Sequence, residues 1–231
     1  MLRTHEEIDS TKTLMVNFVS FGPSSLDFFI YTFTKTTDWV TFHAVKQQIM
    51  FLVLDIISKY GADTARLFMI SDSPPERDLE WSIDGIKATH KYLCKIFDFL
   101  NKDLKFVLDM GKLDGEKLNE FEKDIYNFVN TTIYSFTEDI KSYRFNTAVA
   151  KLRELSNKIL KRDICQDLFD YSWSIFLRLI SIITPHLSQE IASKSGYNKL
   201  LCDLDWPSYD KLCLTSKNVK MVVQKNGKKK L

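Results

Sequence analysis

Paired cysteines are missing from this sequence of 231 residues. It contains four cysteines, none of which forms a Cys-x-x-Cys pair, and the sequence suggests no histidine partner for any of them. Zinc binding is therefore not expected, and the thiols are predicted to be structural ones in a reducing, cytoplasmic environment. The four are Cys94, Cys165, Cys202 and Cys213.

A large excess of charge of either sign is also missing. The chain has 32 Lys and Arg against 30 Asp and Glu, a formal net charge of +2. This balance does not by itself indicate a nucleic-acid partner, and DNA is not expected as one, so RNA binding has to be argued from local clusters of basic side chains. The content of apolar residues, 45%, and of charged residues, 27%, is ordinary for a soluble globular protein.

Two Phe-rich or apolar segments fall short of a membrane span. Residues 14–33 are interrupted by Gly22-Pro23 and Asp27, and residues 171–185 are shorter than the roughly 20 residues that a bilayer requires and contain Arg178. The first residues combine one arginine with several acidic side chains, unlike a secretory signal. A soluble protein without a membrane partner is predicted.

Catalytic and metal-binding patterns are not recognisable either. There is no Gly-rich loop that could hold a phosphate, and the four histidines are isolated in the sequence. His186 follows Pro185 at an expected helix start, where a capping or hydrogen-bonding role is simpler than that of a general base. In residues 76–80 acidic side chains alternate with Arg77, which indicates a salt-bridged loop rather than a metal site. No catalytic, cofactor-binding or metal-binding residue is therefore predicted.

What the sequence does contain, from about Leu54 onward, is a series of amphipathic segments. In three of them apolar residues recur every three or four positions, and a fourth is apolar around most of its circumference, as expected for a central buried helix. Ser82 and Asn146 are expected to cap the first and third segments, and a last short helix should begin at Thr184-Pro185 and end at Gly196. The four segments are residues 82–101, 116–141, 147–161 and 164–183.

Residues 1–53 differ from the rest of the chain. They hold seven of the 17 Phe residues and few charges, and they show neither a sustained helical period nor clean alternation. A strand at residues 31–37 has no evident pairing partner. The segment is predicted to be irregular, so the fold class as a whole is an all-α bundle.

Several motifs resemble one family. Tyr60–Phe68 (YGADTARLF) and Ser73–Trp81 (SPPERDLEW) resemble the junction, in bacterial-type leucyl-tRNA synthetases, between the KMSKS loop and the helical tRNA-binding domain. Arg144–Ala148 (RFNTA) and Thr184–Leu187 (TPHL) resemble the anticodon-binding-type bundle of the same class I synthetases. The resemblance covers about residues 54–228, and the packing of Trp81 is expected to anchor the junction.

The resemblance implies a C-terminal fragment of leucine–tRNA ligase, the enzyme that uses ATP and Mg²⁺ to attach leucine to tRNA-Leu. In intact members the ATP motifs and the leucine pocket precede the matched part, and neither a HIGH-type nor a KMSKS motif is recognisable here. The chain alone is therefore expected to be inactive and to bind no cofactor. The implied divisions are an atypical segment 1–53, a junction 54–81, a helical bundle 82–200, and a linker with the start of a truncated C-terminal domain, 201–231, which begins with a strand at Val219–Gly227.

The same resemblance implies that basic side chains of the bundle meet tRNA phosphates. An ordinary solvated helix face is an equally good interpretation from the residues alone. Lys151, Lys158 and Arg162 fall on one side of a helix because they are seven and four residues apart. The candidates are Arg77, Lys87, Lys91, Arg144, Lys151, Lys158 and Arg162.

Three alternatives remain open for the chain as a whole. It is a non-catalytic RNA-binding or interaction module, one piece of a split enzyme that needs a separate catalytic synthetase chain, or the non-functional product of a decayed gene. The last follows from Val45–Phe51, which in a shifted reading frame could encode Ser-Lys-(Thr/Ala)-(Thr/Ala)-Asn-Asn-Val, similar to the family's KMSKS loop. Residues 1–53 would then be a frame-shifted remnant of the catalytic domain, unless the match is a coincidence of the degenerate code.

Overall fold

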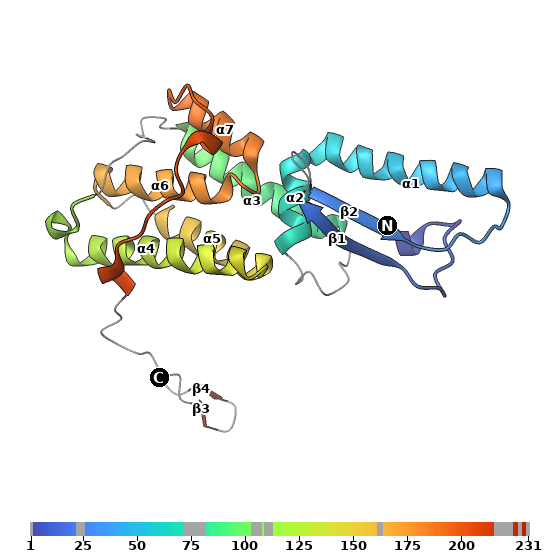
Figure 1. The fold of residues 1–231 in the computed structure, drawn as a ribbon, viewed down its shortest axis with the longest axis horizontal. Coiled ribbons are helices and arrows are strands. Elements are labelled where there is room, and N and C mark those ends of the chain that lie inside the picture. Colours follow the sequence, from blue (N-terminus) through green and yellow to red (C-terminus); the bar gives the residue numbers. More distant parts are fainter. Residues whose placement is uncertain are drawn as a thin grey trace.

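The computed structural model describes residues 2–21, 26–71, 82–102, 108, 113–160, 164–214, 224–225 and 228–229. Within them, a hairpin and a long helix form one end of the molecule, and five helices form a bundle at the other (Figure 1). Helix α2 lies between the two ends. The all-α class is confirmed for the bundle.

The N-terminal part is regular where an irregular segment was expected. After a short 3₁₀ turn, Leu2–Thr4, strand β1 (Met15–Phe21) pairs antiparallel with β2 (Leu26–Tyr31), with an irregular register after Phe18. Both faces of this hairpin carry apolar side chains: Val16 is buried, whereas Phe29, Tyr31 and Phe33 are exposed. Alternation of apolar and polar residues, the usual signal of a strand, is therefore absent from the sequence.

Helix α1 (Trp39–Tyr60) lies along the hairpin (Figure 1). The Asp38 side chain caps its start by accepting from the Thr41 N–H at 2.9 Å, and Gly61, at φ 83°, ends it, as expected for the residue after the last turn. By length and composition alone, α1 is long and apolar enough to cross a membrane, and 11% of its apolar window is buried. From the sequence, only residues 14–33 and 171–185 were considered as possible spans and α1 was not, so the absence of a membrane partner stays a prediction.

Helices α2 (Ala62–Ser71) and α3 (Ile83–Lys102) join the two ends. Phe68 of α2 and Ile86 of α3 belong to a small core with Val45 and Ile49 of α1. Ser82 caps α3 as expected, since its hydroxyl accepts from the Gly85 N–H at 3.3 Å. Residues 72–81, with Trp81 and Arg77, lie outside the described residues.

The bundle consists of α3 with α4 (Glu120–Lys141), α5 (Phe145–Ile159), α6 (Gln166–Ile180) and α7 (Pro185–Lys194). As predicted, α6 is the buried helix, and its Trp173 and Phe176 side chains are fully enclosed. Helix α4 begins four residues later than expected, behind a 3₁₀ turn at Gly115–Lys117, because Asn119 and Glu122 form a capping box there.

Two expected helix caps are absent. Helix α5 starts one residue before Asn146, with Arg144 at the N-cap position and no side-chain cap, because Tyr143 at φ 57° already turns the chain out of α4. Thr184 occupies the N-cap position of α7, but its hydroxyl donates to the Ile180 carbonyl oxygen and does not cap the helix.

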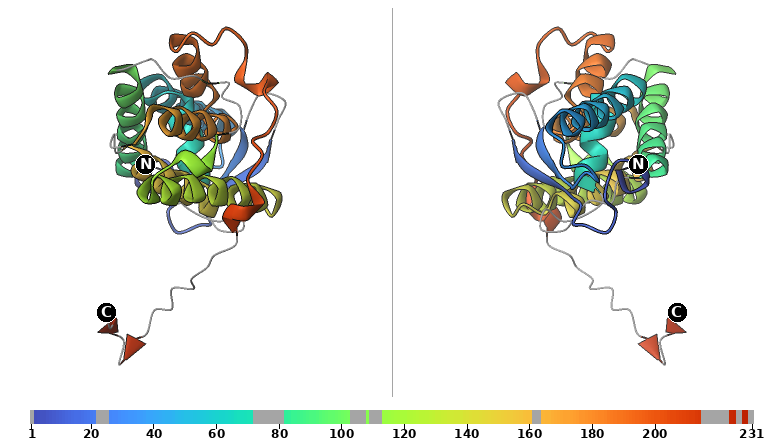
Figure 2. Two further views of the ribbon diagram at one scale, coloured as in Figure 1. Left: turned by 90° about the vertical axis from the view of Figure 1, so that its left-hand side faces the viewer. Right: turned by 90° about the vertical axis from the view of Figure 1, so that its right-hand side faces the viewer.

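Beyond α7, the chain runs as a strap of residues 199–214 down the side of the bundle from α7 to α4 (Figure 2). It contains 3₁₀ turns at Leu201–Asp203 and Lys211–Leu214. Trp206 Nε1 donates to Thr137 Oγ1 at 2.9 Å, and the Asp210 N–H donates to Asn130 Oδ1 at 2.8 Å. Of the strand predicted at residues 219–227, the structure describes only Gln224–Lys225 (β3), which pairs with Lys228–Lys229 (β4).

The close contact between α2 and α3 predicts a steric clash for any side chain placed at Gly85. A Cβ atom there would lie 2.6 Å from Cε2 of the buried Phe68 ring. We expect Gly85→Ala to lower the free energy of unfolding by about 1 kcal/mol, because overpacking outweighs the better helix propensity of alanine. In a Phe68→Leu background the same substitution should stabilise. Urea unfolding of the four variants checks this, and equal effects in both backgrounds would contradict the contact.

Candidate functional site

A buried carboxylate joins two of the motifs that the sequence singled out. Asp63 in the first turn of α2 is 8% exposed, and its Oδ2 accepts from the Leu187 N–H at the start of α7 at 2.7 Å. Its Oδ1 accepts from Arg66 Nη1 at 3.0 Å and lies 2.9 Å from His186 Nδ1. Asp63 thus supplies the cap that Thr184 does not, across 124 residues of sequence.

His186 therefore takes part in capping, though not as a buried group, since 72% of its side chain is exposed. No nucleophile or second acid is found beside it among the described contacts of the cluster, which are those with Asp63 and Arg66. The arrangement holds α2 and α7 together.

A second buried carboxylate engages two of the basic residues predicted to bind tRNA. The side chain of Asp139 on α4 is 3% exposed. Arg144 donates to its Oδ1 through Nη2 at 2.8 Å and Nε at 3.0 Å, while Lys151 Nζ donates to its Oδ2. Lys151 Nζ also donates to the Ser135 carbonyl oxygen at 3.1 Å.

These contacts favour the charged form of the Asp139 carboxyl group. Burial raises the pKa of Asp139, but hydrogen bonds from Lys151, Thr147 and Arg144 outweigh burial, so the pKa is lowered overall. A lowered pKa in the folded state means that the carboxylate stabilises the fold above the unfolded-state pKa, and that this contribution is lost on acidification. Arg144 and Lys151 are thus partners of α4 as well as candidates for RNA.

The other predicted basic residues differ in their surroundings. Lys158 lies over the Phe128 ring, with Nζ 4.2 Å from the centroid, and so also faces α4. Lys87 on α3 is exposed and pairs with Asp84 at 3.1 Å, and Lys91 is exposed one turn further on. Arg77 and Arg162 lie outside the described residues.

Of the predicted basic residues that the structure describes, those on α3 are consequently more open than those near α5. Lys87, Lys91 and Lys95 follow each other at intervals of four, and all three are exposed. We call them the α3 lysine row. Lys95 was not among the predicted contact residues, although the same spacing of four residues indicates it. Whether any of these residues contacts RNA stays a prediction.

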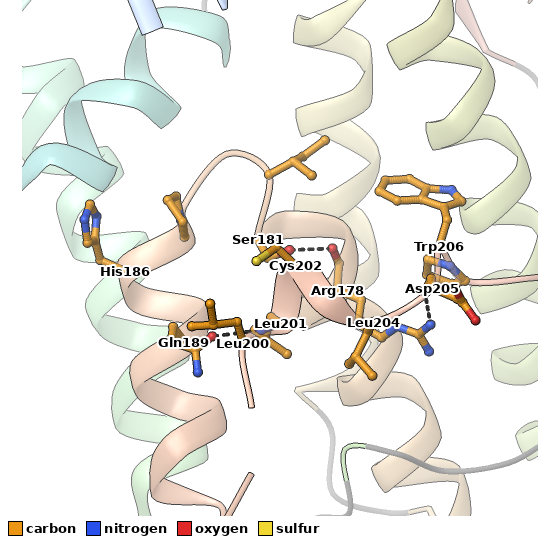
Figure 3. Close-up of a pocket in the computed structure, with 13 residues that line it drawn as sticks. Arg178, Ser181, His186, Gln189, Leu200, Leu201, Cys202, Leu204, Asp205 and Trp206 are labelled. Atoms are coloured by element: carbon orange, nitrogen blue, oxygen red, sulfur yellow. Dashed lines mark hydrogen bonds between the residues drawn. The ribbon is translucent and has the colours of Figure 1, made fainter. Parts of the chain in front are cut away.

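A groove of about 400 Å³ opens where the strap crosses α6 and α7 (Figure 3). Arg178 Nη2 donates to the Asp205 carbonyl, and Gln189 Oε1 accepts from the Leu201 N–H at 2.9 Å, so both side chains hold the strap in place. Most of the remaining lining, such as Leu200 and Trp206, is apolar. The groove has no convergent set of polar groups that would indicate a catalytic site.

One cysteine does have a histidine partner, contrary to expectation. His90 and Cys94 are one turn apart on α3, and Cys94 Sγ lies 3.5 Å from His90 Nε2. The spacing of four residues within a predicted helix could have revealed this contact. By contrast, burial and the nearby Glu122 carboxylate raise the pKa of Cys165.

The described residues contain no group of three or more His, Cys, Asp or Glu side chains able to hold a metal ion. The expectation that the chain binds no cofactor stays a prediction.

Comparisons with known proteins agree with the geometry of the bundle. Residues 122–231 match the family model described as the anticodon-binding domain of tRNA ligase. Residues 1–64, which comprise the hairpin, α1 and the start of α2, match a second model, the C-terminal part of the mechanosensitive ion channel MscS. The second match covers about a quarter of the chain.

Relatives at 34–39% identity are leucine–tRNA ligases. That of Ehrlichia ruminantium is 38% identical over 181 residues, and that of Orientia tsutsugamushi is 39% identical over 175, each across 75% of this chain. The chain spans about a fifth of the length of these relatives, 21% and 20% respectively.

A solved ternary complex, LeuRS-tRNA-LeuAMS from Agrobacterium radiobacter K84 agnB2, shares the fold over 76% of this chain and 23% of its own, with a TM-score of 0.66 at 22% identity. Residues 122–231 therefore match the anticodon-binding domain of the tRNA-ligase class, and the solved complex supports the fold of the helical part. Within that class, three quarters of the chain are similar to leucine–tRNA ligases.

The contacts of Asp139 predict that removing Lys151 and removing Lys158, both on α5, lower the free energy of unfolding by different amounts. Lys151→Ala should lower the free energy of unfolding by about 1–3 kcal/mol, because Asp139 loses a donor while it stays buried. Lys158→Ala loses only a cation–π contact and should cost about 0.5–1 kcal/mol. Urea unfolding at neutral pH compares them. Equal small losses would show that Lys151 is a surface residue without a structural role.

Proposed function

We propose that the helical domain binds tRNA, specifically tRNA-Leu, as the tRNA-binding part of a leucine–tRNA ligase. The observation that carries this proposal is the coincidence of the anticodon-binding match with the closed bundle of α4 to α7. The related LeuRS of the solved complex is bound to tRNA, which supports the same role for this chain. A cytoplasmic location follows from this proposal.

The α3 lysine row is the surface that we propose for contact with the phosphates. At a rise of about 1.5 Å per residue, its three ammonium groups span about 12 Å along the helix. Asp84 partly neutralises Lys87, which leaves Lys91 and Lys95 as the stronger candidates. The basic residues near α5 are weaker ones, because Arg144 and Lys151 already bind Asp139 and Lys158 lies on Phe128.

Contacts of this kind position a nucleic acid without reading its sequence, and they depend on salt. We expect Lys91→Gln/Lys95→Gln to bind tRNA more weakly and to reduce the slope of log K against log salt by about one to two units. Filter binding across a salt series measures this.

The matched control is Lys117→Gln/Lys123→Gln, which removes the same charge from lysines paired with Asp114 and Glu120. Its slope should stay close to that of the unmodified chain. Equal slopes for both double variants would reduce the α3 row to a solvated face, and a larger effect of Lys158→Gln would favour α5 instead.

We assign the activation of leucine to the catalytic parts of the family, which the described residues do not contain. These catalytic parts belong either to a longer chain or to a separate synthetase chain. ATP and Mg²⁺ would act there. We therefore expect the purified 231-residue chain to form no leucyl-adenylate. Leucine-dependent pyrophosphate exchange above that of a mock preparation would contradict this.

The origin of residues 1–53 is tested by the DNA sequence. A frame shift near codon 52 would favour the decayed-gene alternative, and an uninterrupted frame would leave an RNA-binding module or a split enzyme. Retention of tRNA by the chain favours the first of these two.

A further inference from the structure

His90 and Cys94 form a polar pair on the exposed side of α3 that the proposed function does not use. His90 Nδ1 lies 3.1 Å from the carbonyl oxygen of Tyr60, the last residue of α1. A carbonyl oxygen only accepts hydrogen bonds, so Nδ1 carries the proton in this contact and Nε2 is left as an acceptor. The Cys94 thiol faces that acceptor at 3.5 Å.

The imidazole is held in this orientation by more than one contact. Thr64 Oγ1 donates to the same Tyr60 carbonyl at 2.6 Å and lies 3.3 Å from His90 Nδ1. The Tyr60 ring packs edge-on against the imidazole, with centroids 5.5 Å apart. A nucleophile, a base within reach and a third group that orients the base make up the arrangement that activates cysteine.

We propose that Cys94 is a site of reversible mixed-disulfide formation with small anionic disulfides of the glutathione type. His90 acts as its base, and the modification weakens tRNA binding at the α3 lysine row. The second part rests on the function proposed above. Such exchange is typical of exposed, base-assisted thiols in reducing compartments.

The reaction is a thiol–disulfide exchange. His90 Nε2 takes the proton of Cys94 Sγ, and the sulfur attacks one sulfur of glutathione disulfide. A new S–S bond forms and the old one breaks. The departing glutathione thiolate receives the proton from the imidazolium, so Cys94 is oxidised and one glutathione is reduced.

Charged neighbours favour an anionic partner. On α3, Lys91 lies one turn before Cys94 on the same face and Lys95 directly follows it, while Asp98 lies one turn beyond. From α1, Lys59 places its Nζ 5.3 Å from the centre of the Tyr60 ring, which packs against the imidazole. The carboxylates of an attached glutathione would lie beside the lysines that we assign to tRNA phosphates.

The other three cysteines have acidic neighbours instead. Cys202 is exposed like Cys94, but its Sγ lies 3.9 Å from Asp203 Oδ1. Burial, helped by nearby carboxylates, raises the pKa of both Cys165 and Cys213. Cys202 is therefore the internal control for an exposed thiol without a base.

The test of the site is the rate at which glutathione disulfide modifies each cysteine of the full chain at neutral pH, followed by site-resolved mass spectrometry. We expect Cys94 to react about tenfold faster than Cys202, a modest general-base effect. In His90→Asn the side-chain amide can still donate to the Tyr60 carbonyl, but no base remains beside Cys94. The rate at which Cys94 is modified should therefore fall to the rate of Cys202. Equal rates in the unmodified chain, or an unchanged rate in a folded His90→Asn variant, would overturn the proposal.

The test of the consequence is filter binding of tRNA before and after modification, with Cys94→Ser as the control. Retention should fall after glutathionylation, recover with a reducing agent, and stay constant in Cys94→Ser. Unchanged retention by the modified chain would overturn the regulatory part. If the untreated chain retains no tRNA, the proposed function fails, while the site-resolved rates still decide whether Cys94 is the reactive thiol.

Discussion

The carboxylate of Asp63 is the interaction on which the arrangement of this chain depends. A buried charge is tolerated only where donors surround it, and Asp63 finds them on its own helix and at the start of α7. It caps α7 and fixes where α2 lies on the bundle. Because α2 also contacts α1, α3 and α5, the same carboxylate fixes the N-terminal part of the chain relative to the bundle.

Asp139 repeats this principle within the bundle, with consequences for function. Its donors, Arg144 and Lys151, are residues for which the family resemblance had implied contact with RNA. A row of basic side chains on a helix can hold a fold together or meet a ligand, and the pattern in the sequence is the same in both cases. The buried Asp139 carboxylate shows that Arg144 and Lys151 help to hold the fold together. Whether they or the lysines of α3 also contact RNA stays a prediction.

The N-terminal hairpin and α1 differ from the bundle in the family model that they match and in the apolar side chains that they leave exposed. They match a different family model, and apolar side chains remain exposed on both the hairpin and α1. Exposed aromatic residues on one face of a two-stranded sheet remove the alternation by which strands are recognised. This is why regular structure was not predicted for residues 1–53, although helix capping by Asp38 is a local signal.

Local properties of the sequence determined most of the bundle. Periodic apolar residues predicted the helices, Gly196 marked the end of the last one, and the uniformly apolar segment became the buried α6, because each of these signals acts within a few residues. The motifs around Tyr60–Phe68 and Thr184–Leu187 also indicated the family from the sequence alone. Even the His90–Cys94 contact was open to prediction, since it spans a single helical turn.

Only the tertiary structure decided which distant groups meet. Asp63 reaches Leu187 across 124 positions, and Asp139 binds Lys151 on the next helix. A side-chain cap from another helix leaves no trace in local sequence, which is why Thr184 was wrongly expected to cap α7. Helix packing determines which donor pairs with a buried charge. An unpaired buried charge is strongly destabilising, so the charge pairs with whichever donor the packing brings within reach.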